Sequence, residues 1–192
     1  GQELVRQPLG SDGRFVTGGG LPTRVYVVQT FEAIGHVNEF HDGTVCVRGC
    51  SVATIEPVAT TEGVITPIGD LALDPGGHIR GVARDASTGL PLGNLEIQVL
   101  SSTGAQVTLS MTDTSGAYVS RDALPSGSYY VRTTNFNFIN VNALTGYVHE
   151  LYSDVSCGIA CTAGLGTAVE VRAGATTDGV DFHLSRGGTV RG

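Results

Sequence analysis

Lysine and tryptophan are absent from this 192-residue chain, methionine occurs once, and charged residues make up only 15% of it. All eleven basic residues are therefore arginines. Without lysine the chain has no Schiff-base nucleophile, no phosphate-loop lysine and no amine for a lysine–asparagine isopeptide crosslink. The net charge of −7 comes from scattered carboxylates. This argues against nucleic acid and anionic membrane as partners, because both attract clustered basic side chains.

Aromatic residues are also few, at 6%, whereas glycine is abundant, at 28 residues. Runs of Val, Ile, Thr and Tyr are separated by Gly, Ser, Asn and Asp, which is typical of short strands joined by tight turns. Helical periodicity is missing, and strand-like segments recur roughly every 8–15 residues, as in β-sandwiches. The composition predicts an all-β chain.

The chain repeats itself. Shifted by 103 positions, residues 12–30 align with 115–133, and shifted by 111 positions, residues 35–50 align with 146–161. The difference of eight residues between the two shifts places a longer loop in the second copy. A fixed internal period is typical of tandem arrays, whose units mostly serve as spacers or display surfaces.

Domain boundaries follow from a motif that occurs twice, GGHIRG at 76–81 and GGTVRG at 187–192. We predict a partial repeat at 1–75 that lacks the first two strands, a complete repeat at 76–186, and the first strand of a following repeat at 187–192. The chain would then be an excerpt of a longer polypeptide, with adjacent repeats as partners. Short links predict stiffly coupled units, with the paired glycines at 76–77 or 187–188 as the hinge.

The complete repeat is predicted to contain seven strands, at 77–84, 95–100, 105–111, 117–120, 129–134, 168–173 and 180–184, and a short extended segment at 147–152. Alternation of apolar and polar residues predicts which side chains face the core. These are Ile79, Gly81, Ala83, Leu95, Ile97, Val99, Val169, Val171, Val180, Phe182 and Leu184.

Four cysteines form two C-x3-C pairs, Cys46 with Cys50 and Cys157 with Cys161. Such spacing with an intervening glycine allows a local disulfide, and a metal site is the alternative. A metal site needs about four ligands. The cysteines recur in both copies but the nearby histidines do not, so we predict two disulfides.

The carboxylates are weaker candidates for a metal or catalytic site. Five aspartates could be calcium ligands, but each stands alone in a turn, where it caps backbone N–H groups; they are Asp85, Asp113, Asp154, Asp178 and Asp181. A single ion where several loops converge stays an open alternative. Glu39 and Glu150 occupy the same place in both copies. The sequence has neither a nucleophile elbow nor a recognisable glycosidase pair, so we predict no enzyme, no catalytic residue and no cofactor.

The long loop at 135–146 is the sharpest binding candidate, because it mixes amides with aromatics where the second copy gains its extra residues. Loops on a rigid scaffold often carry binding sites. The alternative is that the two phenylalanines cover the open end of the sandwich. The candidate ligand-binding residues are Asn135, Phe136, Asn137, Phe138 and Asn140.

Five motifs in order carry a family resemblance: GGHIRG (76–81), DASTGLPL (85–92), TDTSGAY (112–118), LPSGSY (124–129) and GVDFHL (179–184). Together they resemble the carboxypeptidase regulatory-like repeat, a transthyretin-like (prealbumin-like) sandwich of secreted and surface bacterial proteins. That family is related in fold to the B-type repeats of collagen adhesins. The resemblance implies tandem seven-stranded Greek-key sandwiches, an extracellular setting and a non-catalytic role.

The predicted function is therefore a structural spacer or stalk repeat of an extracellular or cell-surface bacterial protein. The alternative is a carbohydrate- or protein-binding module that uses the loop 135–146. Its partners would be adjacent repeats and, in the alternative, a glycan or another surface protein.

Overall fold

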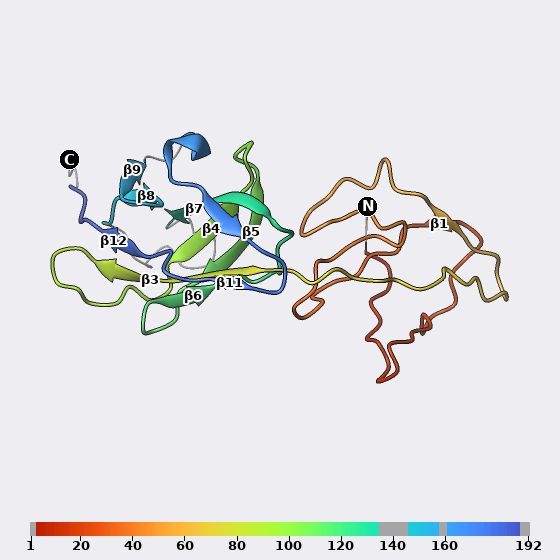
Figure 1. Ribbon diagram of the computed structural model, residues 1–192. Helices are drawn as coiled ribbons and strands as arrows, with labels where there is room; N and C mark the ends of the chain where they lie inside the picture. Colours follow the sequence, from red (N-terminus) through yellow and green to blue (C-terminus); the bar gives the residue numbers. More distant parts are fainter. Residues whose placement is uncertain (1–2, 135–145, 158–160, 189–192) are drawn as a thin grey trace, which may run out of the picture.

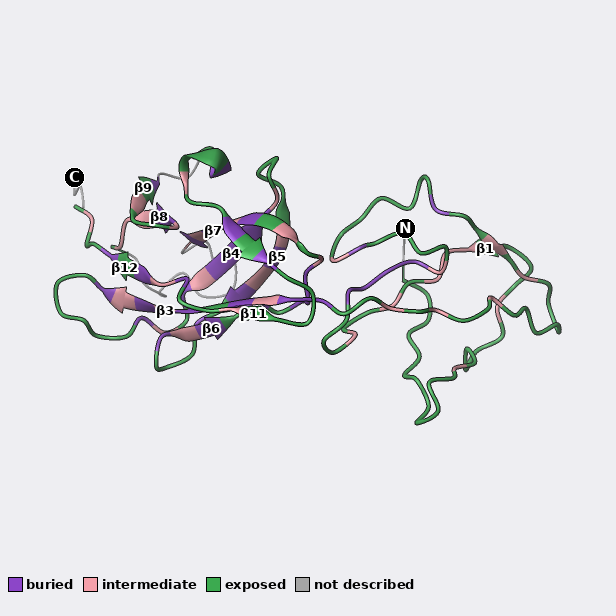
Figure 2. Ribbon diagram, in the orientation of Figure 1, coloured by how far each residue is buried: buried purple, intermediate pink, exposed green. Residues whose placement is uncertain are grey.

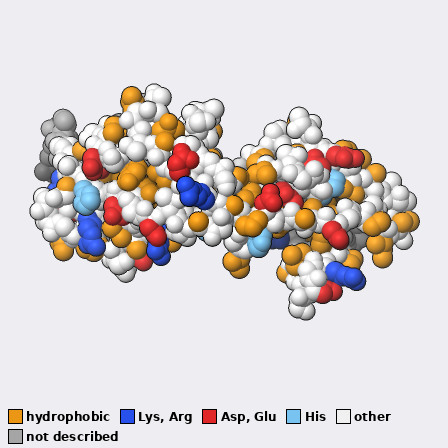
Figure 3. All heavy atoms as spheres, in the orientation of Figure 1, with side chains coloured by type: hydrophobic (Ala, Val, Ile, Leu, Met, Phe, Trp, Pro, Cys, Tyr) orange, Lys and Arg blue, Asp and Glu red, His pale blue; other side chains and the backbone are white. Residues whose placement is uncertain are grey.

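Extended backbone dominates the chain from His78 onward, where β-branched and aromatic residues are frequent. The computed structural model describes residues 3–134, 146–157 and 161–188. We refer to residues 3–75 as the first half and to residues 76–188 as the second half. Figure 1 shows the two halves as separate bodies joined by an extended segment, and Figure 3 shows a narrower waist between them.

Within the described ranges the second half holds ten strands and one short 3-10 helix, and the first half holds two short strands. The elements are β1 (Val25–Tyr26), β2 (Val58–Ala59), β3 (His78–Asp85), β4 (Glu96–Leu100), β5 (Gln106–Met111), β6 (Ala117–Val119), β7 (Gly127–Thr134), β8 (His149–Leu151), β9 (Val155–Cys157), η1 (Ala163–Leu165), β10 (Val169–Val171), β11 (Thr176–Thr177) and β12 (Phe182–Leu184).

Two sheets build the second half. One has the order β5-β4-β7-β8-β9, with β10 also paired to β7, and the other has the order β11-β3-β12, with β6 also paired to β3. β3 runs parallel to β11 and β12 and antiparallel to β6. β3 is thus the strand around which the second sheet is assembled.

Apolar side chains of both sheets form one core, visible as the buried segments of Figure 2. Phe182 is fully buried and lies between Tyr118, at 6.4 Å between ring centroids, and Tyr152, at 6.3 Å. All eleven residues predicted to face the core are buried. The second half is an all-β sandwich, as predicted. β9, β11 and η1 were not predicted from the sequence.

The first half has a much smaller core, formed by Phe40, Cys46 and Ile55 with Val27 packed against it. Residues 3–20, which align with the strands β5 and β6 of the second half, contain no strand in the structure. A strand needs a neighbour for its backbone groups and a second layer for its apolar face. Residues 3–20 have neither, and this is the physical reason for the difference from the second half.

Candidate functional site: the junction between the halves

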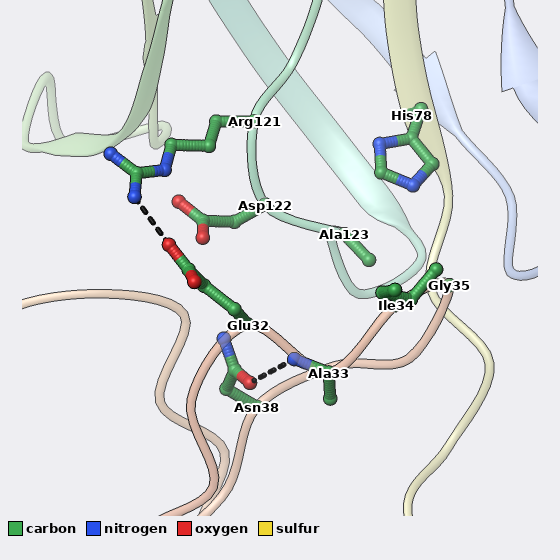
Figure 4. A pocket seen from close by; sticks show the side chains of 9 residues that line it. All are labelled: Glu32, Ala33, Ile34, Gly35, Asn38, His78, Arg121, Asp122 and Ala123. Carbon is green, nitrogen blue, oxygen red and sulfur yellow. Dashed lines mark hydrogen bonds and ion pairs between the residues drawn. The ribbon is translucent and has the colours of Figure 1, made fainter. Parts of the chain in front are cut away.

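The two halves meet at a cavity of about 260 Å³, lined by Glu32, Ala33, Ile34, Gly35 and Asn38 of the first half and by His78, Arg121, Asp122 and Ala123 of the second. Figure 4 shows the loop of residues 32–35 facing the loop of residues 121–123 across this cavity. Both loops are polar at one end and small or apolar at the other. The residues between them determine how the halves are held.

Gly76 is bonded to both halves. Its N–H donates to the Gly35 carbonyl at 3.0 Å, and its own carbonyl accepts from the Gly174 N–H at 3.0 Å. A Cβ at position 76 would lie 2.5 Å from the Cβ of Ala123 and 3.1 Å from a methyl group of Val37. Only glycine fits between the halves here, and a residue held in this way is not a hinge.

Gly77 is equally confined. It exchanges two backbone hydrogen bonds with Leu124, both 2.8 Å long. A Cβ on Gly77 would lie 2.4 Å from the carbonyl oxygen of Arg172. The prediction of stiff coupling agrees with this geometry, whereas the prediction of a hinge at 76–77 is wrong, because the glycines allow close backbone approach rather than rotation.

In the part of the chain that the structure describes, one ion pair crosses the junction, from Arg121 to Glu32 (Figure 4). The two side chains are 50% and 52% exposed, so solvent screens the pair and its contribution to stability is small, about 0–1 kcal/mol. Next to it, Asn38 accepts the Ala33 N–H at 3.1 Å and fixes the turn that carries Glu32. The ion pair therefore affects the orientation of the two halves more than it adds to the free energy of unfolding.

The other polar groups of the cavity are engaged within the second half. Asp122 is 8% exposed and accepts the Thr108 hydroxyl at 2.6 Å. His78 Nδ1 lies 3.1 Å from the Ser120 carbonyl oxygen, and the Ser120 hydroxyl accepts the Ile79 N–H at 3.2 Å. These contacts fix the loop that faces the first half, and the arrangement is suited to holding two bodies together.

Hydrogen bonds of the first half recur in the second half at the shifts found in the sequence. The Tyr26 hydroxyl donates to the Pro22 carbonyl at 3.1 Å, as the Tyr129 hydroxyl does to the Pro125 carbonyl at 3.0 Å. The Thr30 hydroxyl accepts the N–H of Glu39 at 2.8 Å. Its counterpart, the Thr133 hydroxyl, accepts the N–H of Glu150 at 2.9 Å.

Backbone hydrogen bonds also recur at the end of each half. The Val37 N–H donates to the Asp74 carbonyl at 2.9 Å, as the Val148 N–H does to the Ser185 carbonyl at 2.9 Å. The hydrogen bond from the Gly76 N–H to the Gly35 carbonyl likewise has an equivalent, from the Gly187 N–H to the Gly146 carbonyl, at 2.6 Å. Each half thus ends in the same backbone arrangement.

Both carboxyl groups shared by the copies are buried. Glu39 is 9% exposed and Glu150 is 5% exposed. Burial raises the pKa of Glu150 to about 7, with Asp154 adding repulsion. Burial also raises the pKa of Glu39, and Asp74 and Asp42 add to it. The sequence signal for these residues was their equivalent position, but it did not reveal their burial.

Both predicted disulfides are present, Cys46–Cys50 with Cα atoms 5.8 Å apart and Cys157–Cys161 with Cα atoms 5.5 Å apart. Cys46 and Cys157 are the buried partners, at 1% and 3% exposure. Cys157 lies in β9, which pairs with β8, the strand that carries Glu150. Among the described residues, no group of three or more His, Cys, Asp or Glu is arranged to hold a metal ion.

Two of the five aspartates serve as turn caps, as expected. Asp85 accepts the N–H groups of Ser87 and Thr88, both at 2.9 Å. The Ser87 hydroxyl, and after it that of Tyr147, lower the pKa of Asp85 by donating hydrogen bonds to its carboxylate. Asp113 accepts the Ser115 N–H at 2.8 Å, and the pKa of Asp113 is lowered mainly by the Ser115 hydroxyl.

The remaining three aspartates do not cap a turn by a side-chain hydrogen bond to its backbone, although Asp154 lies in a turn as predicted. Asp178 pairs with Arg80 at 2.5 Å, and Asp181 accepts the Val82 N–H at 2.9 Å. Asp154 has positive φ, at 57°, in the turn between β8 and β9. The candidate ligand-binding residues Asn135, Phe136, Asn137, Phe138 and Asn140 lie outside the described residues.

No model of a protein family matches the chain, and no curated protein does. The resemblance to the carboxypeptidase regulatory-like repeat therefore stays a prediction. Similar solved structures include a 5-hydroxyisourate hydrolase of Klebsiella pneumoniae, at 15% identity and a TM-score of 0.36. This similarity covers 58% of the present chain and 92% of that protein.

The TIE protein of Bacillus anthracis is similar at 18% identity and a TM-score of 0.41, over 94% of this chain and 28% of that protein. A minor pilin of Streptococcus agalactiae is similar at 17% identity and a TM-score of 0.37, over 60% of this chain and 46% of that protein. The chain thus spans less than half of these two proteins. Because identities and TM-scores are low, the function is inferred below from this chain's own residues.

Proposed function

We propose that the chain is a non-catalytic spacer or stalk segment of transthyretin-like repeats in an extracellular or cell-surface protein. The observation that carries the proposal is the junction, where Gly76 is hydrogen-bonded to Gly35 on one side and Gly174 on the other. A spacer has to keep neighbouring units at a fixed orientation. Backbone bonds to both units, with no room for a side chain between them, meet this requirement.

The recurring hydrogen bonds support a division into repeats. We propose a partial repeat at 1–75, a complete repeat at 76–186 and the start of another at 187–192. Equivalent bonds of Gly76 and Gly187 would then mark equivalent ends of two units. Partners of the chain are adjacent repeats of the same kind.

The two disulfides support an oxidising location, because disulfides persist outside the cytosol and are rare within it. The described residues include no helix of the length and hydropathy needed to cross a bilayer. The polar side chains of the junction cavity are hydrogen-bonded or ion-paired within the fold, which supports a structural rather than a catalytic role.

Small-angle X-ray scattering of the chain at low concentration tests the proposal, together with the variant Gly76→Ala. We expect an elongated, rigid particle for the natural chain. Gly76→Ala should loosen the junction and raise the flexibility seen in the scattering curve, because its Cβ would overlap that of Ala123. Gly188→Ala is the matched control, since a Cβ there meets no atom within 4 Å. A single compact globule for the natural chain would contradict the spacer role.

A further inference from the structure

The disulfide Cys46–Cys50 lies beside the junction. The Cys46 N–H donates to the Asn38 carbonyl at 2.8 Å. The side-chain oxygen of Asn38 in turn accepts the Ala33 N–H at 3.1 Å, and both residues line the junction cavity (Figure 4). Cys46 is therefore hydrogen-bonded directly to a residue that fixes the loop facing the second half.

The ring that this disulfide closes also contacts the second half directly. Val47 lies inside the ring, and its side chain packs against the hydrophobic core of the second half. Among the described residues that pack against this core, Val47 alone comes from the first half. The ring thus supplies an apolar contact between the halves, in addition to the ion pair of Arg121 with Glu32.

Little besides the disulfide fixes the backbone of this ring. Within the described part of the chain, the N–H and C=O groups of residues 47–50 form no hydrogen bond with other backbone groups. Cys46 is also one of the three buried residues in the small core of the first half, with Phe40 and Ile55. The disulfide therefore links the core of the first half to the segment that contacts the second half.

The disulfide of the second half has a different place. Cys157 belongs to β9, whose backbone is paired with β8. Figure 1 shows β9 on the side of the second half that is turned away from the first half. Of the two disulfides, only Cys46–Cys50 is positioned to act on the junction, and the other serves as an internal control.

The two cysteines of the junction ring differ in exposure. Cys46 is 1% exposed, whereas Cys50 is exposed. Exchange with a thiol begins when a thiolate reaches one sulfur of the disulfide. A reductant in solution therefore approaches this bond from the Cys50 side, and Cys46 is the buried leaving group.

We infer that the Cys46–Cys50 disulfide is a redox switch of the junction, which a dithiol reductant opens. This rests on the spacer proposed above, because it concerns regulation of the same junction. One thiolate of the reductant bonds to the Cys50 sulfur, and the Cys46 sulfur leaves with the electron pair and takes a proton from water. The second thiolate then displaces the Cys50 sulfur, which is also protonated. The two electrons come from the dithiol, which is oxidised to a disulfide.

Reduction changes the junction because the ring loses its restraint. Residues 47–50 regain the conformational freedom that ring closure removes, and keeping Val47 on the second half then costs entropy. The halves separate more often, and the hydrogen bond from the Gly76 N–H to the Gly35 carbonyl breaks more often with them. The oxidised spacer is stiff, and the reduced one is flexible at the junction.

Hydrogen exchange of the Gly76 amide, followed by NMR spectroscopy, tests this inference, because that amide is bonded across the junction. The variant with Cys157→Ser and Cys161→Ser keeps only the Cys46–Cys50 bond. In this variant dithiothreitol should speed exchange at Gly76 by about ten- to thirtyfold, which is the loop-closure estimate for so short a ring expressed as a ratio of rates.

The reciprocal variant is the matched control. With Cys46→Ser and Cys50→Ser, only the distant disulfide remains, and exchange at Gly76 should be fast with or without dithiothreitol. A second pair of variants keeps both disulfides. Val47→Ala shortens the side chain that reaches the second half and should speed exchange at Gly76 in the oxidised chain. Val45→Ala, at a side chain 48% exposed just before the ring, should leave it unchanged.

Exchange at Gly76 that does not respond to reduction, or that Val47→Ala leaves unchanged, would overturn the inference. An equal increase at Thr60 would also overturn it, because the Thr60 N–H donates to Arg24 within the first half and would report unfolding of that half. Scattering of the oxidised chain separates the two proposals. An elongated particle with an unresponsive Gly76 contradicts the redox switch alone, and a compact oxidised particle contradicts the spacer role.

Discussion

Single residues of this chain fall into two electrostatic classes. Asp85 and Asp113 accept several hydrogen bonds, which lowers the pKa of both. Glu39 and Glu150 are buried with few donors, and one oxygen of Glu150 has no hydrogen-bond partner. Burial raises the pKa of both glutamates. The turn aspartates therefore stabilise the fold when ionised, whereas the glutamates do so when protonated.

This difference predicts how stability depends on pH. Between about 4.5 and 7 the folded chain keeps the Glu150 proton and the unfolded chain releases it, because the pKa is about 7 in the fold and 4.5 in the unfolded chain. The free energy of unfolding should fall as pH rises through this window, by roughly 1–3 kcal/mol, and then level off. The lowered pKa values of Asp85 and Asp113 act below this window. Burial raises the pKa of Glu39, which adds to the decline, and lowers the pKa of His149, which opposes it.

Urea unfolding at a series of pH values measures the effect. Glu150→Gln should flatten the decline, since the amide has no proton to lose in this range. Glu170→Gln, on an exposed position of β10, is the control and should leave the slope unchanged. A slope that persists in Glu150→Gln would show that another group is responsible.

Among the elements, the core strands of the second half were predictable because alternation of apolar and polar residues is a local signal. β9 and β11 were not, since Val155–Cys157 and Thr176–Thr177 are only three and two residues long, too short for alternation to be a signal, and they pair because neighbouring strands lie beside them. The junction was beyond prediction for the same reason. Gly76 is confined by Ala123, which is distant in sequence.

The sequence signal for the disulfides was the recurrence of the cysteine pairs in both copies. The short loops that they close limit their contribution to the free energy of unfolding. Each links cysteines four positions apart. Closing so short a loop removes little freedom from the unfolded chain, and the loop-closure estimate is about 2 kcal/mol. Replacing Cys157 and Cys161 by serine should lower the free energy of unfolding by that amount or less.

Mass spectrometry of the natural chain gives the direct check. Reduction should add the mass of about four hydrogens, two for each bridge. Labelling of all four cysteines by an alkylating reagent without reductant would contradict the disulfides and weaken the proposed extracellular location.

At the scale of the whole molecule, the halves differ in how completely their backbone is paired. The second half has two sheets and a core that spans both. The first half keeps the bonds of equivalent strands near the junction but has no second sheet in its described residues. Local stability follows the number of buried contacts and protected backbone bonds. It should therefore decrease from the second half, through residues 21–75, to residues 3–20.

Limited trypsin digestion reports this order directly, because the chain has no lysine and trypsin therefore cuts only after arginine. Arg6 and Arg14 are exposed in the part of the chain without strands, and we expect them to be cut first. Arg24 should resist longer, since its carbonyl accepts the Thr60 N–H at 2.8 Å. Arg80 lies within β3, which is paired on both sides, and should be cut last. Early cleavage at Arg80 would mean that the junction opens more readily than residues 3–20 are cut, and neither the rigid spacer nor the repeat boundary at Gly76 would survive that result.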